Sequence, residues 1–600
     1  MCGMAGFSGL GSGGDVLLPK MLSDLRHRGP EGSSTMFRDL IALGHTHLAF
    51  TDLSQAAVQP MVSTRAALTF NGEIFNHLEL ANAKCIACST TSDTEVLLSC
   101  LEREGLDILP ELNGFFAIAF VDFVSQKLYL IRDRFGVKPL YYVHLGGLFG
   151  FASEIHPLRH LLPFTPDRDV VFHNLVGNWT QGTKTGINGV YRVQPGCYVE
   201  YDLRNGHLET KRWFSLADLR DDRLHSELDA CTFGQLVERT TITLVESALR
   251  RATSRAPLAV LCSGGLDSGL LTAILANERP EIEAFSVDFP TLPKWSEFPW
   301  AESLGLHLGK TIHPVTITPE RWRALFVKTA MHFEYPLWHE SSISIAAIAE
   351  DLRRQGFKGV LGGDGADELF GGYDYKYLPQ REAYAAWAHL PPAICTADPQ
   401  EVVHDPILTE LYGPYVPHPE DMRYRQEVWA MAAEAAHSES AAERDLEAIL
   451  ATELHLFLGI VLCRMDRSLM QYGIEGREPY LDNELVRLAF NIPLRWKTQP
   501  RTKEILRGVA KPYLPDAILE RKKRGFSLDP EDFLRGHMNP HFLLEANLRD
   551  HLQIGKAKWR RAVAELKGRS VLRAAGGEIW FRSIFMNESS AVIEEALWSA

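Results

Sequence analysis

The pattern of apolar residues changes near Leu236, and this change constrains the fold more than any other feature of the chain. From that point, short apolar runs alternate with stretches of helical periodicity. Such alternation is typical of a parallel sheet whose strands are joined by crossover helices. We expect strands over residues 256–261, 282–289 and 358–361, and helices over residues 267–277, 300–308 and 344–355. The remainder of the chain favours helix.

The first 210 residues or so favour β structure with short helices. The expected strands cover residues 66–70, 115–121, 128–131, 140–143 and 198–203, and the expected helix covers residues 94–104. Residues 215–229 are charged and lack periodicity, so we expect a linker there. These patterns predict two domains, over residues 1–212 and 230–600.

Composition excludes several classes of protein. The chain has 600 residues, of which 46% are apolar, and its 76 acidic and 62 basic residues give a net charge of −14. This is a globular composition whose mean field repels nucleic acid and anionic membranes, so we expect neither as a partner. The run over residues 115–121 is far short of the roughly 20 residues that cross a bilayer. Nine scattered cysteines and no signal peptide favour a cytoplasmic protein with reduced thiols.

A thiol stands at the second position, in Met1-Cys2-Gly3. Methionine aminopeptidase removes Met before small residues, which would make Cys2 the N-terminus. Its α-amine, with a pKa of about 8, could then act as the base for a thiol whose own pKa is about 8.5. This pattern predicts a nucleophile that needs no histidine.

Small residues follow the expected strand at 256–261, in the order Ser263-Gly264-Gly265-Leu266-Asp267-Ser268. Small residues let the backbone curl around an anion, and the N-terminus of the following helix supplies N–H groups. The Gly-Lys-Ser/Thr ending of a Walker loop is absent. We therefore expect a phosphate-binding loop of another kind.

A second loop, over residues 361–373, holds three acids among five glycines directly after the expected strand at 358–361. Carboxylates at a sheet edge suit Mg²⁺ and a nucleotide. The acids are Asp364, Asp367 and Glu368.

Several motifs occur in a fixed order: residues 26–32, 44–48, 71–76, 92–95, 132–142 and 151–155, then the two loops above, then residues 476–482, 503–507 and 521–527. Together they resemble the asparagine synthetase family. That resemblance implies an N-terminal-nucleophile αββα sandwich, followed by a parallel-sheet ATP-pyrophosphatase domain with a helical C-terminal part. It also implies ATP as co-substrate, Mg²⁺ as cofactor and glutamine as nitrogen donor.

The resemblance assigns Cys2 as nucleophile and places the oxyanion hole at the Asn71 side chain and the Gly72 N–H. It implies a glutamine pocket formed by His47, Leu48, Ala49, Phe50, Thr51, Asn71, Gly72, Glu73 and Asp93. One position departs from the family pattern, because His47 stands where an arginine usually grips the glutamine carboxylate. A mostly neutral imidazole cannot match a guanidinium fork. Glutamine should therefore bind more weakly, unless another cation such as Arg28 compensates.

For the nucleotide, the resemblance implies a site formed by Cys262, Ser263, Gly264, Gly265, Asp267, Ser268, Val287, Gly362 and Gly363. Asp267 and Asp367 match the magnesium-binding acids. Asp364 matches the base that receives a proton from the incoming amine, and Lys503 matches the residue that stabilises phosphate charge.

The implied reaction joins ammonia to an acyl-adenylate, with aspartate as the default acceptor. Trp338, His339, Glu340 and Ser344 are unusual for the segment before the second loop, which leaves another carboxylate of specialised metabolism open as the acceptor. A non-catalytic regulatory or binding homologue is the alternative from a different class, although the intact site residues argue against it. The oligomeric state stays open, with a homodimer as one option.

Overall fold

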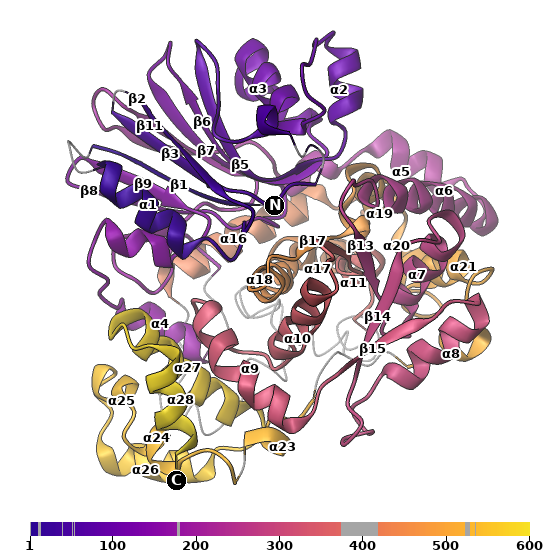
Figure 1. Cartoon of the computed structure of the whole chain (residues 1–600). Coiled ribbons are helices and arrows are strands. Elements are labelled where there is room, and N and C mark those ends of the chain that lie inside the picture. Colours follow the sequence, from indigo (N-terminus) through magenta and orange to yellow (C-terminus); the bar gives the residue numbers. More distant parts are fainter. Residues whose placement is uncertain are drawn as a thin grey trace.

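Two six-stranded antiparallel sheets face each other in the first part of the chain (Figure 1). The computed structural model describes residues 2–9, 14–38, 40–50, 52, 54–176, 181–373, 418–522, 528–534 and 536–599. The first sheet has the order β10 (Val190–Arg192), β8 (Tyr141–Leu145), β9 (Leu148–Ala152), β1 (Gly3–Ser8), β3 (Ile41–Thr46) and β2 (Ser33–Arg38). The second has the order β12 (Leu208–Arg212), β11 (Cys197–Asp202), β7 (Lys127–Arg132), β6 (Gly114–Asp122), β5 (Ala66–Ile74) and β4 (Met61–Val62).

Helices cover the outer face of each sheet. Helix α1 (Gly14–Asp24) packs on β1 and β3, and α3 (Asp93–Glu104), which contacts α2 (His77–Ala83), packs on β5. Apolar side chains of both sheets, among them Met4, Leu43 and Leu128, fill the space between them. The predicted αββα sandwich is therefore confirmed, and its expected strands and helix lie within one to four residues of the observed ends.

The segment expected to be an irregular linker is instead helical. Residues 216–219 form a short 3-10 turn capped by Ser215, and α5 (Asp222–Asp229) follows with Asp221 as its N-cap. Leu224 and Leu228 are four residues apart and both are buried, so the charged residues occupy the outer face of an amphipathic helix. Because most residues of this segment are charged or polar, its apolar stripe of two leucines was not recognised in the sequence.

A five-stranded parallel sheet forms the core of the second part, in the order β15 (Ile312–Thr316), β14 (Glu283–Asp288), β13 (Leu258–Leu261), β16 (Gly359–Leu361) and β17 (Glu475–Arg477). The order reverses between β13 and β16. Ligands of open α/β sheets bind at such a switch point, outside the carboxyl ends of the strands. The two loops that the sequence singled out follow β13 and β16, so both lie there.

Helices surround this sheet and make up most of the remaining described residues (Figure 1). Those around the sheet and before the second loop are α6 (Phe233–Arg251), α7 (Leu266–Glu278), α8 (Phe298–Leu308), α9 (Pro319–His332), α10 (Ser341–Arg354) and α11 (Ala366–Phe370). Those that follow are α16 (Pro419–Ala435), α17 (Ala441–His455), α18 (Phe457–Met470), α19 (Asn483–Asn491), α20 (Leu494–Thr498), α21 (Glu504–Ala510), α22 (Asp516–Leu519), α23 (Glu531–Leu534), α24 (Pro540–Leu544), α25 (Asn547–His551), α26 (Lys556–Glu565), α27 (Arg569–Phe585) and α28 (Ser590–Trp598). Helix α4 (Arg168–Val176) belongs to the first part of the chain.

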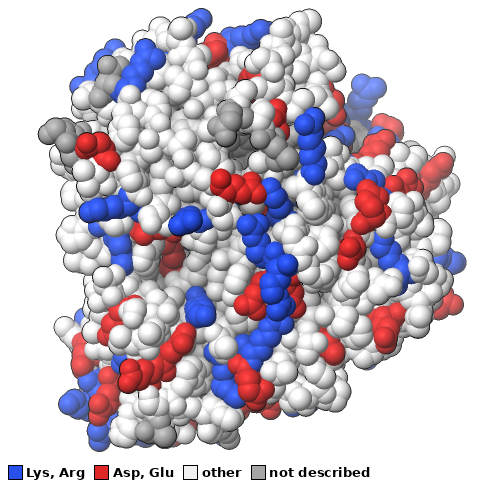
Figure 2. All heavy atoms as spheres, viewed as in Figure 1, with Lys and Arg blue, Asp and Glu red and all other residues white. Residues whose placement is uncertain are grey.

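Among the described residues, one helical stretch, Glu443–Met470, is long and apolar enough to cross a membrane by length and composition alone, with a mean hydropathy of 1.9 over an 18-residue window. Within the protein 78% of that window is buried, which is the pattern of a core helix. On the face shown in Figure 2, basic and acidic side chains lie beside one another.

Candidate active site

The Cys2 thiol lies directly before β1, a central strand of the first sheet. Its Sγ accepts a hydrogen bond from the Leu48 N–H at 3.4 Å, and the Cys2 backbone N–H donates to Asn71 Oδ1 at 3.3 Å. The residue is buried, and this burial raises the pKa of the thiol. The fold therefore holds the thiol at a fixed place between β3 and β5.

Asn71, on β5, is fully buried, and its Nδ2 has no hydrogen-bond partner among the described residues. A buried donor without a partner is costly, so its place beside a thiol points to a ligand that accepts from it. Gly72 follows with a φ of +154°, and a Cβ there would lie 2.0 Å from the Phe115 carbonyl oxygen. Only glycine fits this position. Asn71 thus contacts Cys2 directly, and Gly72, the second predicted oxyanion donor, follows it on β5.

Two further residues of the predicted glutamine site, Glu73 and Asp93, are buried carboxylates. Asp93, at the start of α3, accepts from the Ile74 N–H through Oδ2 at 3.0 Å. Glu73 binds the guanidinium of Arg477, at 3.0 Å through Oε1 and 2.7 Å through Oε2. Burial raises the pKa of both acids. Sequence reasoning missed this pairing, because Arg477 belongs to the other half of the chain.

The His47 imidazole lies against the Ser34 hydroxyl. Its Nε2 lies 3.0 Å from Ser34 Oγ, and burial lowers the pKa of its imidazole. Arg28, the alternative cation, is fully buried: its Nε donates to the Cys2 carbonyl at 3.4 Å, and its Nη1 lies 2.8 Å from Glu154 Oε1 and 3.0 Å from Asp466 Oδ2. Arg28 is therefore committed to holding the two halves of the protein together.

The rest of the predicted glutamine-binding segment runs from Cys2 to the second half. After Leu48, the Ala49 carbonyl accepts from Lys358 Nζ at 3.3 Å, and the Phe50 carbonyl accepts from the Arg255 N–H at 3.1 Å. Thr51 lies outside the described residues. The segment thus connects the surroundings of Cys2 to residues that lie shortly before β13 and β16 of the parallel sheet.

The predicted phosphate loop closes tightly on itself. Ser268 Oγ accepts from the Ser263 N–H at 3.1 Å, and Ser263 Oγ accepts from the Gly265 N–H at 3.3 Å. Gly264 has a φ of +67°, and a Cβ there would lie 2.6 Å from backbone atoms of Trp300 and Ala301. Gly265 then caps α7. The loop has the tight turn and helix start that an anion site needs.

The remaining predicted nucleotide residues surround this loop. The buried Cys262 donates its N–H to the Phe285 carbonyl at 2.9 Å, and Val287 lies two residues further along β14. A Cβ on Gly363 would lie 3.4 Å from the Ser268 N atom. The two loops therefore touch across the switch point.

Two carboxylates converge on one ammonium beside the phosphate loop. Lys503 Nζ lies 2.6 Å from Asp267 Oδ2 and 2.5 Å from Asp367 Oδ1. Burial works against its charge, but the two carboxylates hold the pKa of Lys503 above its usual range. Carboxylate oxygens gathered at one cation are the donor set that Mg²⁺ prefers, so these residues fit the magnesium ion that the family implies.

The Asp364 N–H donates to Glu478 Oε2 at 3.2 Å. Glu478 follows β17 and is buried, and its burial and the charge of Asp364 raise the pKa of its carboxyl well above the usual range. A Cβ on Gly362 would lie 2.5 Å from the same oxygen. Glu478 is a second residue at the site to which sequence reasoning assigned no role, although its motif was recognised.

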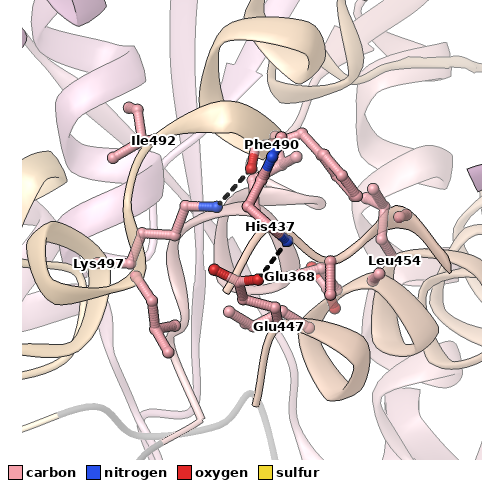
Figure 3. Close-up of a pocket in the computed structure, with 13 residues that line it drawn as sticks. Glu368, His437, Glu447, Leu454, Phe490, Ile492 and Lys497 are labelled. Carbon is pink, nitrogen blue, oxygen red and sulfur yellow. Dashed lines mark hydrogen bonds between the residues drawn. The ribbon is translucent and has the colours of Figure 1, made fainter. Parts of the chain in front are cut away.

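A small cavity of about 30 Å³ lies beside α11 (Figure 3). Glu368 lines it, whereas its neighbour Asp367 binds Lys503 at the nucleotide loops. Lys497 also lines the cavity and donates to the Phe490 carbonyl at 3.2 Å; burial lowers the pKa of its ammonium to about 8. The neighbouring acids Asp367 and Glu368 thus lie on different faces of the short helix α11.

Comparisons with known proteins agree with this two-part arrangement. The model of the asparagine synthase family matches residues 240–574, and that of the glutamine amidotransferase domain matches residues 1–214. Asparagine synthetase 1 (glutamine-hydrolyzing) of Bacillus subtilis is 26% identical over 562 residues, which cover 88% of this chain and 86% of the relative. Amidase chry2 of Gibberella zeae is 26% identical over 592 residues and covers 86% of each chain. Amidase chyE of Penicillium rubens is 30% identical over 367 residues, 58% of this chain and 53% of the relative.

Proposed function

This chain belongs to the asparagine synthase family, and we propose from that premise that it transfers the amide nitrogen of glutamine to a carboxylate through an acyl-adenylate. Glutamine-dependent, ATP-using amidation by a ligase follows from the two family matches. The observation that supports the proposed chemistry best is the Asn71 side chain: its Oδ1 accepts from the Cys2 N–H, and its Nδ2 has no partner among the described residues.

In the first half reaction, Cys2 attacks the side-chain amide carbon of glutamine. Removal of Met1 would expose the Cys2 amine, which Asn71 Oδ1 already orients and which can take the thiol proton. The oxyanion that forms would accept from Asn71 Nδ2 and the Gly72 N–H. Ammonia then leaves, and water hydrolyses the thioester to glutamate and free thiol.

In the second half reaction, the acceptor carboxylate attacks the α-phosphorus of ATP and pyrophosphate leaves. Ammonia attacks the acyl carbon, Asp364 receives a proton from the amine, and AMP leaves. Lys503 supplies a fixed positive charge beside the phosphates. Asp267 and Asp367 would hold Mg²⁺, which neutralises phosphate charge when bound.

Aspartate is the first candidate acceptor, which would make asparagine the product. The support is the asparagine synthetase of B. subtilis, which this chain matches over 86% of that relative's length.

Another carboxylate of specialised metabolism is the second candidate. The two amidase relatives favour it, and so does the unusual segment before the second loop. There, Arg569 binds Glu340 through Nε and Nη2, each at 3.0 Å, and its Nη2 lies 3.3 Å from His339 Nε2. His339 and Glu340 are both buried. They lie beside Trp338, at the carboxyl edge of the sheet where α10 begins.

Pyrophosphate release from ATP, measured with a panel of carboxylates and with glutamine as donor, tests the proposal. Aspartate-dependent release with asparagine as product would support the first candidate. Release with a different carboxylate only would support the second. If neither pyrophosphate nor amide formed with any acceptor, the chain would be a non-catalytic homologue and the proposal would fail.

A further inference from the structure

Strand β17 and the residue after it reach both active sites. The strand is the edge of the parallel sheet and pairs with β16, with Arg477 opposite Leu361. Glu475, Arg477 and Glu478 are all buried. The segment therefore lies between the Cys2 pocket and the nucleotide loops and has little room to shift.

The side chain of Arg477 points to the glutamine side. Its Nη2 binds both oxygens of Glu73, and its Nη1 donates to the carbonyls of Arg251 at 2.7 Å and Thr253 at 2.8 Å. The guanidinium also lies over the Phe50 ring, 5.0 Å from its centroid. A planar group held by this many partners has one orientation, and the position of Glu73 depends on it.

The backbone of the same residue holds the nucleotide side. The Arg477 carbonyl accepts from the Gly362 N–H at 2.9 Å, and Glu478 accepts from the Asp364 N–H at 3.2 Å. Gly362 and Asp364 begin the loop that carries the acids of the synthetase site. A displacement of Arg477 would therefore move this loop as well as Glu73.

We propose that Arg477 is a positioning residue that couples the glutamine pocket to the nucleotide site, so that binding at one changes affinity at the other. The inference rests on the proposed function, because it needs Glu73 to lie against bound glutamine and Gly362 to lie against bound nucleotide. A polar group of bound glutamine at Glu73 would compete with the guanidinium for the same carboxylate. Both ligands thus depend on the position of Arg477. The free energy spent in fixing that position for one ligand affects the binding of the other.

Coupling of this kind is reciprocal: each ligand must change the affinity of the other by the same factor. Calorimetric titration of the full-length Cys2→Ala protein, which cannot turn glutamine over, measures that factor. We expect Mg-ATP to change the Kd of glutamine by about 5- to 150-fold, the usual range for coupled sites, and glutamine to change the Kd of ATP equally. With Arg477→Lys in the same background, the factor should fall toward 1 in both titrations.

Asn113→Ala is the matched control. Asn113 is buried at the same interface, where its Nδ2 donates to Asp482 Oδ2 at 2.9 Å and its Oδ1 accepts from Arg251 Nη2 at 2.8 Å. Neither bond goes to Glu73 or to the nucleotide loops. This variant should lose stability but keep the coupling factor, whereas a merely structural Arg477 would leave the factor unchanged in both variants.

A coupling factor of 1 in the Cys2→Ala parent, or an unchanged factor in Arg477→Lys and Arg477→Met, would overturn the inference. If Arg477→Met does not fold, Arg477→Lys, which keeps the charge but cannot bridge Glu73 and both carbonyls, decides the question. A parent that bound neither glutamine nor ATP would overturn the proposed function and the coupling together. A parent that bound both without linkage would overturn the coupling alone.

Discussion

Lys503 Nζ lies 2.5 Å from Asp367 Oδ1, a contact that joins the start of α21 to the start of α11 across the nucleotide site. Asp267 lies on the other side of the same ammonium, at 2.6 Å. One side chain thus balances two carboxylates that come from two different loops. A bound cation would change this balance, because it competes with the ammonium for the same oxygens.

Removing either carboxylate charge should stop adenylation without stopping glutamine hydrolysis. In Asp267→Asn or Asp367→Asn, the shape of the side chain stays but half of the negative charge is lost. We expect pyrophosphate release to disappear while glutamate release continues. Asp351→Asn, on the outward end of α10 where Arg321 binds it, is the control and should release pyrophosphate normally. Normal release in both site variants would refute the magnesium assignment.

Removing the ammonium should make stability depend on magnesium. Lys503→Met leaves Asp267 and Asp367 facing each other without a cation, which is unfavourable for partly buried acids. We expect its Tm to fall in EDTA and to recover with added Mg²⁺, because a ligand at 100 times its Kd stabilises the folded state by about 2.7 kcal/mol. The unchanged protein should show a smaller shift. Equal shifts in both would mean that magnesium does not take the place of the ammonium.

The same variant should adenylate its acceptor poorly. Loss of one preorganised charge at a transition state typically costs about 10²–10³ in rate. Rapid-quench measurement of acyl-adenylate formation in Lys503→Met checks this. An unchanged rate at saturating Mg²⁺ would show that Lys503 acts only on the folded ground state.

Loss of the thiol should separate the two nitrogen sources. Cys2→Ala should lose glutamine-dependent amidation and keep amidation with free ammonium. Asn71→Ala should lower glutamine hydrolysis by about 10²–10³-fold, the range for a lost oxyanion donor. Asn76→Ala, whose amide donates to the Glu111 carbonyl at 2.9 Å, serves as the matched control. Full glutamine use by Cys2→Ala would refute the nucleophile assignment.

Hydrolysis of glutamine should also speed up with rising pH. Burial raises the pKa of the Cys2 thiol, so the reactive thiolate is a minor species at neutral pH and grows as the pH rises. The ammonium-dependent rate of the Cys2→Ala protein corrects for the pH dependence of the second site. A glutaminase rate that stayed flat between pH 7 and 9 would contradict this.

Local patterns predicted most of this architecture. The phosphate loop and its helix start depend on residues within six positions of one another, so sequence alone reveals them. The Glu73–Arg477 pair joins residues 404 positions apart, and no local pattern reports it. The helix over Asp222–Asp229 was missed for a different reason: its two buried leucines are outnumbered by charged neighbours. The main part of the site that the sequence could not predict is therefore the set of long-range contacts between the two halves of the chain.

The structure gives His47 a hydrogen-bond partner and a lowered pKa that its position in the sequence did not predict. The Ser34 hydroxyl donates to the Gln59 carbonyl, so it must accept from His47, whose Nε2 therefore carries the proton. Burial lowers the pKa of His47 from its ordinary value of 6.5, and the imidazole is neutral at pH 7. An imidazole with its ordinary pKa would gain charge, and so tighten glutamine binding, as the pH falls toward 6. The structure moves this effect to lower pH, since the imidazole gains its charge only below its reduced pKa.

Replacing His47 by arginine should tighten glutamine binding if the carboxylate lies where the family places it. A charge-assisted hydrogen bond contributes about 1.5–3 kcal/mol, which is about a 10- to 150-fold lower Kd. Titration of glutamine into Cys2→Ala and Cys2→Ala/His47→Arg proteins isolates binding from the protonation of the thiol. His47→Gln, neutral at every pH, is the control and should abolish any gain in affinity below pH 6. The charge of Arg28 is already balanced by Glu154 and Asp466, so we expect it to contribute less to glutamine binding than an arginine at residue 47 would. If the arginine variant bound glutamine no better than the parent, the carboxylate of the donor would have to lie away from residue 47.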